Sequence, residues 1–209
     1  MLVFLMACGS TDGSGGSGGS AGVGGESGSG GSAGAGGDGG TGGSGGMGGG
    51  VEPEALVVFV TSSIQTAALG GFDGADATCA GEATSAGLEG EFKAWLSTLD
   101  TAAADRLTQS SGPYVLTDGT RIADNWNDLI DNQLLAPINL DAMGRSQGGD
   151  VWTGTLPSGQ PYEEDDCAGY TSDSAGKGLC GSTGSTGSSW SAATDPPCRT
   201  RLRLFCFEQ

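Results

Sequence analysis

The chain of 209 residues contains no histidine, and this absence removes several classes of function at once. Ser–His and Cys–His nucleophile systems need an imidazole as general base, so neither can be assembled here. No CxxC pair is present, so the sequence spells out neither a zinc ribbon nor a dithiol redox motif. No motif marks a pair of catalytic carboxylates either. We therefore expect a protein that is not an enzyme, with a glycosidase-like enzyme as a remote alternative.

Basic residues are scarce, because 8 Lys and Arg stand against 25 Asp and Glu. Three of the 25 acids lie in the first 50 residues, so residues 51–209 hold the other 22 acids and all 8 bases, a net charge near −14. A field of this sign repels nucleic acid, heparin-like polyanions and bare anionic membrane surfaces. We expect no nucleic-acid partner and no heparin-like partner, and we expect simple cations as counterions.

Long apolar runs are also missing: only seven residues precede Cys8, whereas a bilayer-spanning helix needs about 20. The segment LVFLMACGS, residues 2–10, resembles the end of a bacterial lipoprotein signal peptide. This resemblance implies that residues 1–7 are a shortened signal peptide, that Cys8 is lipidated, and that the exported protein is anchored in a membrane of the cell envelope. The residues after Cys8 favour the outer membrane. A chance apolar start with a stray cysteine is the alternative.

Residues 9–50 are almost entirely Gly, Ser, Ala and Thr, and they include 24 of the 43 glycines. Such a composition buries too little apolar area to offset the entropy of ordering, so we expect a disordered tether. Its typical end-to-end span is roughly 35 Å. We therefore expect three parts: a signal peptide at 1–7, lipidated Cys8 with its tether at 8–50, and one folded domain at 51–209.

The folded part shows a mixed α+β pattern. The apolar run 56–61 predicts a strand, and residues 70–74 predict a loop before a helix that Asp73 or Asp76 caps and Gly87 ends. A half-buried strand follows, in which Phe92, Ala94 and Leu96 alternate with Lys93, Trp95 and Ser97. Asp100 is predicted to cap a short helix.

The second half of the domain predicts short strands and long loops. Residues 113–123 predict a hairpin that turns at Asp118-Gly119, and residues 125–135 predict a helical turn. A strand is expected at 151–155, a turn at 157–159 and a flexible loop at 181–189. The last strand, 199–207, places Leu202, Leu204 and Cys206 on one face.

The stretch GADATCAGEATSAGLEGEFKAWLS, residues 74–97, resembles the opening helix and strand of the collagen XVIII/XV endostatin domain. It resembles more closely the bacterial endostatin-like lipoprotein domains of unknown function. Matching stretches follow in order along residues 57–209: YVLTDGTRIADNW (114–126), APIN (136–139), VWTGTLPSG (151–159), CAGYT (167–171), SW (189–190) and LFC (204–206).

The resemblance implies a C-type-lectin-like fold with two nested disulfides, Cys79–Cys206 and Cys167–Cys198. Cys180 falls outside this four-cysteine pattern, and three states stay open for it: a reduced thiol, a bond between two chains, or competition for Cys167. The zinc and heparin sites of endostatin do not carry over. The chain has no histidine, and its only basic cluster lies on the last strand, at Arg199, Arg201 and Arg203.

Two groups of residues are candidates for binding. The run Glu163-Glu164-Asp165-Asp166 offers oxygen ligands of the kind that Ca²⁺ takes, although a solvated run of charge is the favoured interpretation. No other metal or cofactor is indicated. Tyr162 and Tyr170, which flank these acids and Cys167, are the better candidates for rings that contact a ligand. Trp152 and Trp190 are expected in the core. The triplet Trp126-Asn127-Asp128 matches a Ca²⁺-ligand triplet of sugar-binding lectins, and we interpret it as coincidence.

These observations predict a surface-anchored bacterial lipoprotein that presents a non-catalytic, lectin-like domain to a glycan, protein or matrix partner. The principal alternative is a structural envelope or coat lipoprotein without a discrete ligand. A glycan array distinguishes these two expectations, because only the first predicts a saturable hit.

Overall fold

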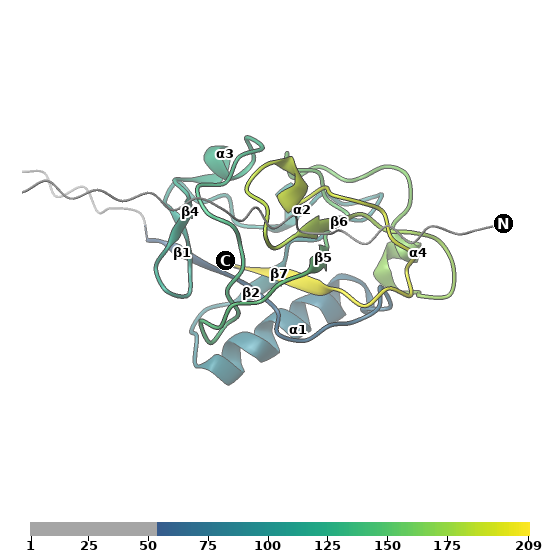
Figure 1. Ribbon diagram of the computed structural model, residues 1–209, viewed down its shortest axis with the longest axis horizontal. Helices are drawn as coiled ribbons and strands as arrows, with labels where there is room; N and C mark the ends of the chain where they lie inside the picture. Colours follow the sequence, from purple (N-terminus) through teal and green to yellow (C-terminus); the bar gives the residue numbers. More distant parts are fainter. Residues whose placement is uncertain (1–53) are drawn as a thin grey trace, which may run out of the picture. The chain divides into compact units, whose positions relative to one another are not determined.

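The computed structural model describes residues 54–209. The predictions for the signal peptide, for Cys8 and for the tether lie outside the described residues. Within residues 54–209 the fold is mixed α+β, as the sequence predicted (Figure 1). Its elements in chain order are β1 (Leu56–Val60), α1 (Gly71–Ala86), β2 (Phe92–Ala94), α2 (Ala103–Arg106), β3 (Tyr114–Leu116), β4 (Arg121–Ala123), α3 (Trp126–Leu129), β5 (Asp150–Trp152), α4 (Cys167–Tyr170), β6 (Cys180–Ser182), the 3-10 helix η1 (Ser188–Trp190) and β7 (Arg203–Glu208).

The strands form one curled sheet in the order β4-β3-β1-β7-β5-β6, with β2 also paired to β7. Two pairs are parallel, β1 with β3 and β5 with β7, and the other pairs are antiparallel. The last strand is the centre of the sheet. It pairs with β1 and β2 through its final residues and with β5 through Arg203 and Leu204. The predicted hairpin is confirmed, because β3 and β4 pair around a turn in which Gly119 has φ 85°.

Both faces of the central strands are buried, which explains their unbroken apolar sequences. Phe59 of β1 and Leu204 and Cys206 of β7 join a core cluster that also holds the buried face of α1. Val58, Val60, Phe205 and Phe207 point the opposite way, into a second cluster with α2, α3 and η1. Figure 1 shows α1 along one face of the sheet, and α2 and α3 with several loops across the other. The shared face of Leu202, Leu204 and Cys206 is thus confirmed.

Helix α1 begins earlier than the sequence predicted. Residues 70–74 are not a loop, and neither Asp73 nor Asp76 is the cap: the N-cap is Gly70, in the left-handed region at φ 87°. Asp76 instead accepts a hydrogen bond from the Ala94 backbone N–H (2.9 Å) and pairs with the Arg106 guanidinium (2.7 Å), tying α1 to β2 and α2. The helix ends as expected, with Gly87 in the left-handed region.

Three other local predictions were wrong. Trp95 and Ser97 are fully buried rather than exposed, since the second cluster continues over this side of the chain. Asp100 does not cap α2; the N-cap is Ala102, and the Ser97 hydroxyl accepts from the Ala103 N–H (2.8 Å). The expected flexible loop at 181–189 contains the last two residues of β6 and the first two residues of η1.

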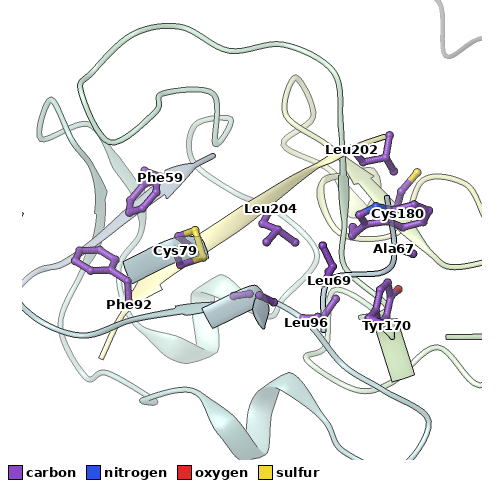
Figure 2. Close-up of a cluster of buried hydrophobic side chains, with 14 of the residues drawn as sticks. Phe59, Ala67, Leu69, Cys79, Phe92, Leu96, Tyr170, Cys180, Leu202 and Leu204 are labelled. Atoms are coloured by element: carbon purple, nitrogen blue, oxygen red, sulfur yellow. A yellow bond between two sulfur atoms is a disulfide. The ribbon is translucent and has the colours of Figure 1, made fainter. Parts of the chain in front are cut away.

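Two disulfides brace the domain, on the same pairs that the resemblance implied. Cys79 of α1 is bonded to Cys206 of β7, 127 residues apart, and the bond lies among Phe59, Phe92 and Leu204 (Figure 2). Cys167 is bonded to Cys198 across a long loop. Cys180 is part of neither bond; it is buried, and its sulfur lies 3.1 Å from the Thr194 hydroxyl. Two structural disulfides are typical of proteins from an oxidising compartment.

Candidate functional site

A short loop at residues 154–162 carries the tyrosine that the sequence singled out. The two ends of the loop lie side by side, because Thr155 bridges Pro161 and the Tyr162 N–H donates to the Gly154 carbonyl (2.9 Å). Its tip is a tight turn at 157–159, as predicted. The Gly159 carbonyl accepts a hydrogen bond from the Ala104 N–H (3.1 Å), which fixes the turn to α2. The backbone beside Tyr162 is therefore held in place before any ligand arrives.

The loop forms one wall of an open hollow of about 540 Å³. The hollow combines three polar side chains with an apolar wall and one aromatic ring, and we call it the Tyr162 hollow. Its lining residues are Leu156, Gln160, Pro161, Tyr162, Glu163 and Glu164. The volume lies in the range of small-molecule sites, although this one is open rather than enclosed. It is the largest of the three hollows that are described in this section.

The Tyr162 side chain is half-buried, so part of its ring remains accessible. A hydrogen bond to the Glu164 carboxylate raises the pKa of the phenol, and burial and the charges of Glu164 and Asp195 raise it further. The phenol therefore stays protonated and donates to Glu164. Part of the ring remains accessible in the hollow, where its face can contact a ligand.

The acidic run divides into two pairs with different roles. Asp165 accepts hydrogen bonds from the backbone N–H groups of Cys167 (3.0 Å) and Lys177 (2.9 Å). Asp166 is buried and accepts from the N–H groups of Leu99 (3.0 Å) and Gly169 (2.8 Å). These two carboxylates stabilise the backbone around the Cys167–Cys198 bond. Glu163 and Glu164 are exposed and line the hollow.

The hydrogen bonds of Asp165 and Asp166 decide whether the run Glu163–Asp166 can bind Ca²⁺. Ca²⁺ takes six to eight oxygen ligands, and four adjacent carboxylates would have to converge on it. Asp165 and Asp166 are directed to backbone N–H groups instead. Among residues 54–209, no group of three or more His, Cys, Asp or Glu side chains is arranged to hold a metal ion. The four carboxylates of Glu163–Asp166 therefore do not converge in the way that a calcium site requires.

The second tyrosine prediction was wrong, because Tyr170 is a core residue. Its side chain is 0 % exposed and its ring packs edge-on against Trp152, with centroids 6.0 Å apart. Burial, followed by the charges of Asp166, Cys180 and Asp165, raises the pKa of Tyr170 far above its ordinary value. Residues 167–170 all have positive φ, and this unusual turn directs the ring inward. Trp152 and Trp190 are buried, as expected.

A second hollow, of about 360 Å³, lies between α3 and the segment after α2. Its lining is uncharged, with amides and hydroxyls beside the edge of an indole: Gln109, Ser110, Ser111, Asn125, Trp126 and Asn127. The triplet 126–128 lies on α3, where Asn125 caps the helix and Trp126 is buried against Trp95. Asp128 accepts from the Asp124 N–H (2.7 Å). The triplet thus has structural roles, which agrees with its interpretation as coincidence.

A third, smaller hollow of about 160 Å³ lies beside α1. Two carboxylates in its lining, Glu82 and Asp141, already accept hydrogen bonds from the protein. Glu82 accepts hydrogen bonds from the N–H and hydroxyl groups of Ser62 and Ser63. Burial by itself would raise the pKa of Asp141, but hydrogen bonds from the backbone of Arg145 and Met143 and from the side chains of Gln147 and Arg145 lower it. These carboxylates have protein partners, so the hollow offers a ligand little.

Of the three hollows, only the Tyr162 hollow combines an accessible ring with carboxylates, Glu163 and Glu164, that accept no hydrogen bond from an N–H group within residues 54–209. It is therefore the best candidate site. The lining contains no serine, cysteine or lysine. Leu156, Gln160 and Pro161 escaped sequence reasoning, because only the fold of the loop brings them beside Tyr162.

No helix within residues 54–209 has both the length and the apolar content needed to cross a bilayer. No protein-family model matches the chain, and the search of curated proteins found no match.

Proposed function

We propose that the domain is a C-type-lectin-like, endostatin-related binding module that holds a glycan in the Tyr162 hollow without altering it chemically. The observation that carries the proposal is the half-exposed Tyr162 ring on a loop whose backbone is fixed at both ends. Aromatic rings offer a flat apolar face for the C–H face of a pyranose. Gln160, Glu163 and Glu164 supply hydrogen-bonding groups for sugar hydroxyls at the rim.

The lectin-like assignment has support from the fold as well. The domain has mixed α+β architecture, its first helix is bonded to its last strand, and a second disulfide closes the long loop. The site lies on a loop held by a rigid sheet, which is where binding residues commonly occur. A pre-formed loop also costs less ordering entropy when a ligand binds.

A glycan array tests this proposal with the full chain carrying Cys8→Ser, which keeps the protein in solution without a lipid. We expect a saturable hit and an affinity about tenfold lower for Tyr162→Ala, since an aromatic contact is typically worth about 1–2 kcal/mol. Tyr162→Phe keeps the ring and should bind within about threefold of the parent chain.

The matched control is Asn127→Ala, which removes an exposed polar side chain from the second hollow. It should leave binding unchanged. Equal binding by Tyr162→Ala and the parent chain would remove this hollow as the site. A silent array would instead favour the alternative, a structural envelope or coat protein whose surface contacts neighbouring proteins without a discrete ligand.

We further propose that the module is displayed outside the cytoplasm on a lipid attached to Cys8. The two disulfides favour an oxidising compartment, and the segment before Cys8 resembles a lipoprotein signal peptide. Mass spectrometry of the protein from bacterial membranes should find a diacylglyceryl group on an N-terminal Cys8. An unmodified cysteine inside an uncleaved chain would refute the anchor, and Cys8→Ser should release the protein from the membrane fraction.

A further inference from the structure

We propose that the Tyr162 hollow selects a glycan that carries protonated amino groups, such as a de-N-acetylated hexosamine, over neutral glycans. This inference rests on the function proposed above and specifies its ligand class. It comes from three features of the hollow: two carboxylates that form no ion pair within the described residues, an accessible aromatic ring, and a surrounding charge that is strongly negative.

Within the described residues, no ion pair neutralises the charge of Glu163 or Glu164. Among the described residues, five ion pairs engage five of the eight bases, and none involves Glu163 or Glu164. The nearest candidate cation in sequence, Lys177, is paired with Asp195 at 3.1 Å. A neutral sugar would have to displace water from two carboxylates without compensating their charge, whereas an ammonium group forms charge-assisted hydrogen bonds with them.

The ring and the apolar wall favour an amino sugar over a simple cation. A metal ion needs converging oxygen ligands, which the described part of the chain does not bring together here. Tyr162, Leu156 and Pro161 instead provide an apolar surface beside the charge. A hexosamine presents both partners on one ring, a C–H face for the tyrosine and an ammonium group for the carboxylates. The aromatic face also attracts the cation itself.

The net negative charge of the domain also favours a cationic ligand. Residues 51–209 carry 22 acids and 8 bases, and no base lines the hollow. The charges of Glu164 and, less strongly, of Asp195 both raise the pKa of the Tyr162 phenol, so more than one carboxylate acts on this residue. Such a field speeds the approach of a polycation and repels anionic glycans, and salt weakens both effects.

The test compares glucosamine oligomers with N-acetylglucosamine oligomers of equal length, using the full chain with Cys8→Ser and calorimetry at low salt. We expect binding of the glucosamine oligomer to be about tenfold tighter. Glu163→Gln combined with Glu164→Gln should abolish this preference while weaker binding of the acetylated oligomer persists. Glu54→Gln with Glu89→Gln removes the same charge from exposed positions outside the hollow, and it should retain most of the preference.

The outcomes separate the two proposals. Equal affinity for both oligomers, or tighter binding of the acetylated one, overturns the amino-sugar inference and leaves glycan binding intact. No binding of any glycan overturns the proposed function and the inference together. Oligolysine is included as a second cation. If oligolysine binds the parent chain while the glucosamine oligomer does not, the hollow recognises basic peptide and the amino-sugar assignment is wrong.

Discussion

Replacing Cys79 and Cys206 together with alanine should lower the free energy of unfolding by about 4–5 kcal/mol, the largest effect that we expect from any pair of substitutions. The bond joins α1 to β7 across 127 residues, so it removes a large amount of conformational freedom from the unfolded chain. Both residues are fully buried, and the loss of two sulfur atoms also leaves space in the first core cluster. Urea unfolding of the purified protein measures the change.

The matched comparison is Cys167→Ala with Cys198→Ala, which opens a bond that spans only 31 residues. Chain entropy assigns this bond about 3.5 kcal/mol, roughly 1 kcal/mol less than the longer one. The longer bond should therefore be the costlier one to lose. Reductant should lower the stability of the parent chain but change a variant lacking both bonds very little. If the shorter bond proves the more stabilising, chain entropy is not the main contribution, and packing around Cys167 must exceed it.

The sequence predicted best those features that depend on local chemistry. The alternation of β7 follows from a period of two, and both faces of this strand are buried because it lies at the centre of the sheet. Gly87 and Gly119 adopt positive φ where a helix end and a hairpin turn require it. Each of these predictions needs only a few neighbouring residues, so nothing elsewhere in the fold overrides it.

The failures at Asp76 and Tyr170 share a cause, which is contact between segments far apart in the chain. Asp76 is a good helix cap by residue type, but its carboxylate is engaged by Ala94 and Arg106. Tyr170 is directed into the core by a left-handed turn that the disulfide and the Asp166 carboxylate help to define. The sequence identified Tyr162, Glu163 and Glu164, which are half of the residues that line the candidate site. The apolar wall of the site forms only when the loop folds.

The segment 181–189 gives the sharpest contrast between composition and structure. Its glycines and serines are typical of a flexible loop, yet Gly181 lies in β6 and is buried against η1. A Cβ atom on Gly181 would lie 1.9 Å from the Trp190 carbonyl oxygen and 2.9 Å from the Ser191 Cα. These are backbone atoms, so no side-chain rotation relieves the overlap. Gly181 is thus required by close packing and not by a need for flexibility.

Gly181→Ala should therefore destabilise the domain by about 3 kcal/mol or more, since η1 would have to move away from the sheet. Trp190 packs in the second core cluster against Trp95, with ring centroids 4.9 Å apart, so its displacement opens that cluster. Ser191 would move too. Its hydroxyl accepts from the Trp95 indole N–H (2.7 Å) and donates to the Thr155 carbonyl (2.7 Å), which connects η1 to the loop of the Tyr162 hollow.

Gly187→Ala in the same segment is the matched control, because a Cβ atom there meets nothing within 4 Å and the backbone has φ −81°. Its stability should stay within about 1 kcal/mol of the parent chain, and a small gain is expected from the reduced entropy of the unfolded state. Urea unfolding of both variants measures the difference, and tryptophan fluorescence reports on the packing of Trp190. Equal stability of the two variants would mean that 181–189 is the flexible loop its composition suggests, and that β6 and η1 do not hold the Tyr162 loop in place.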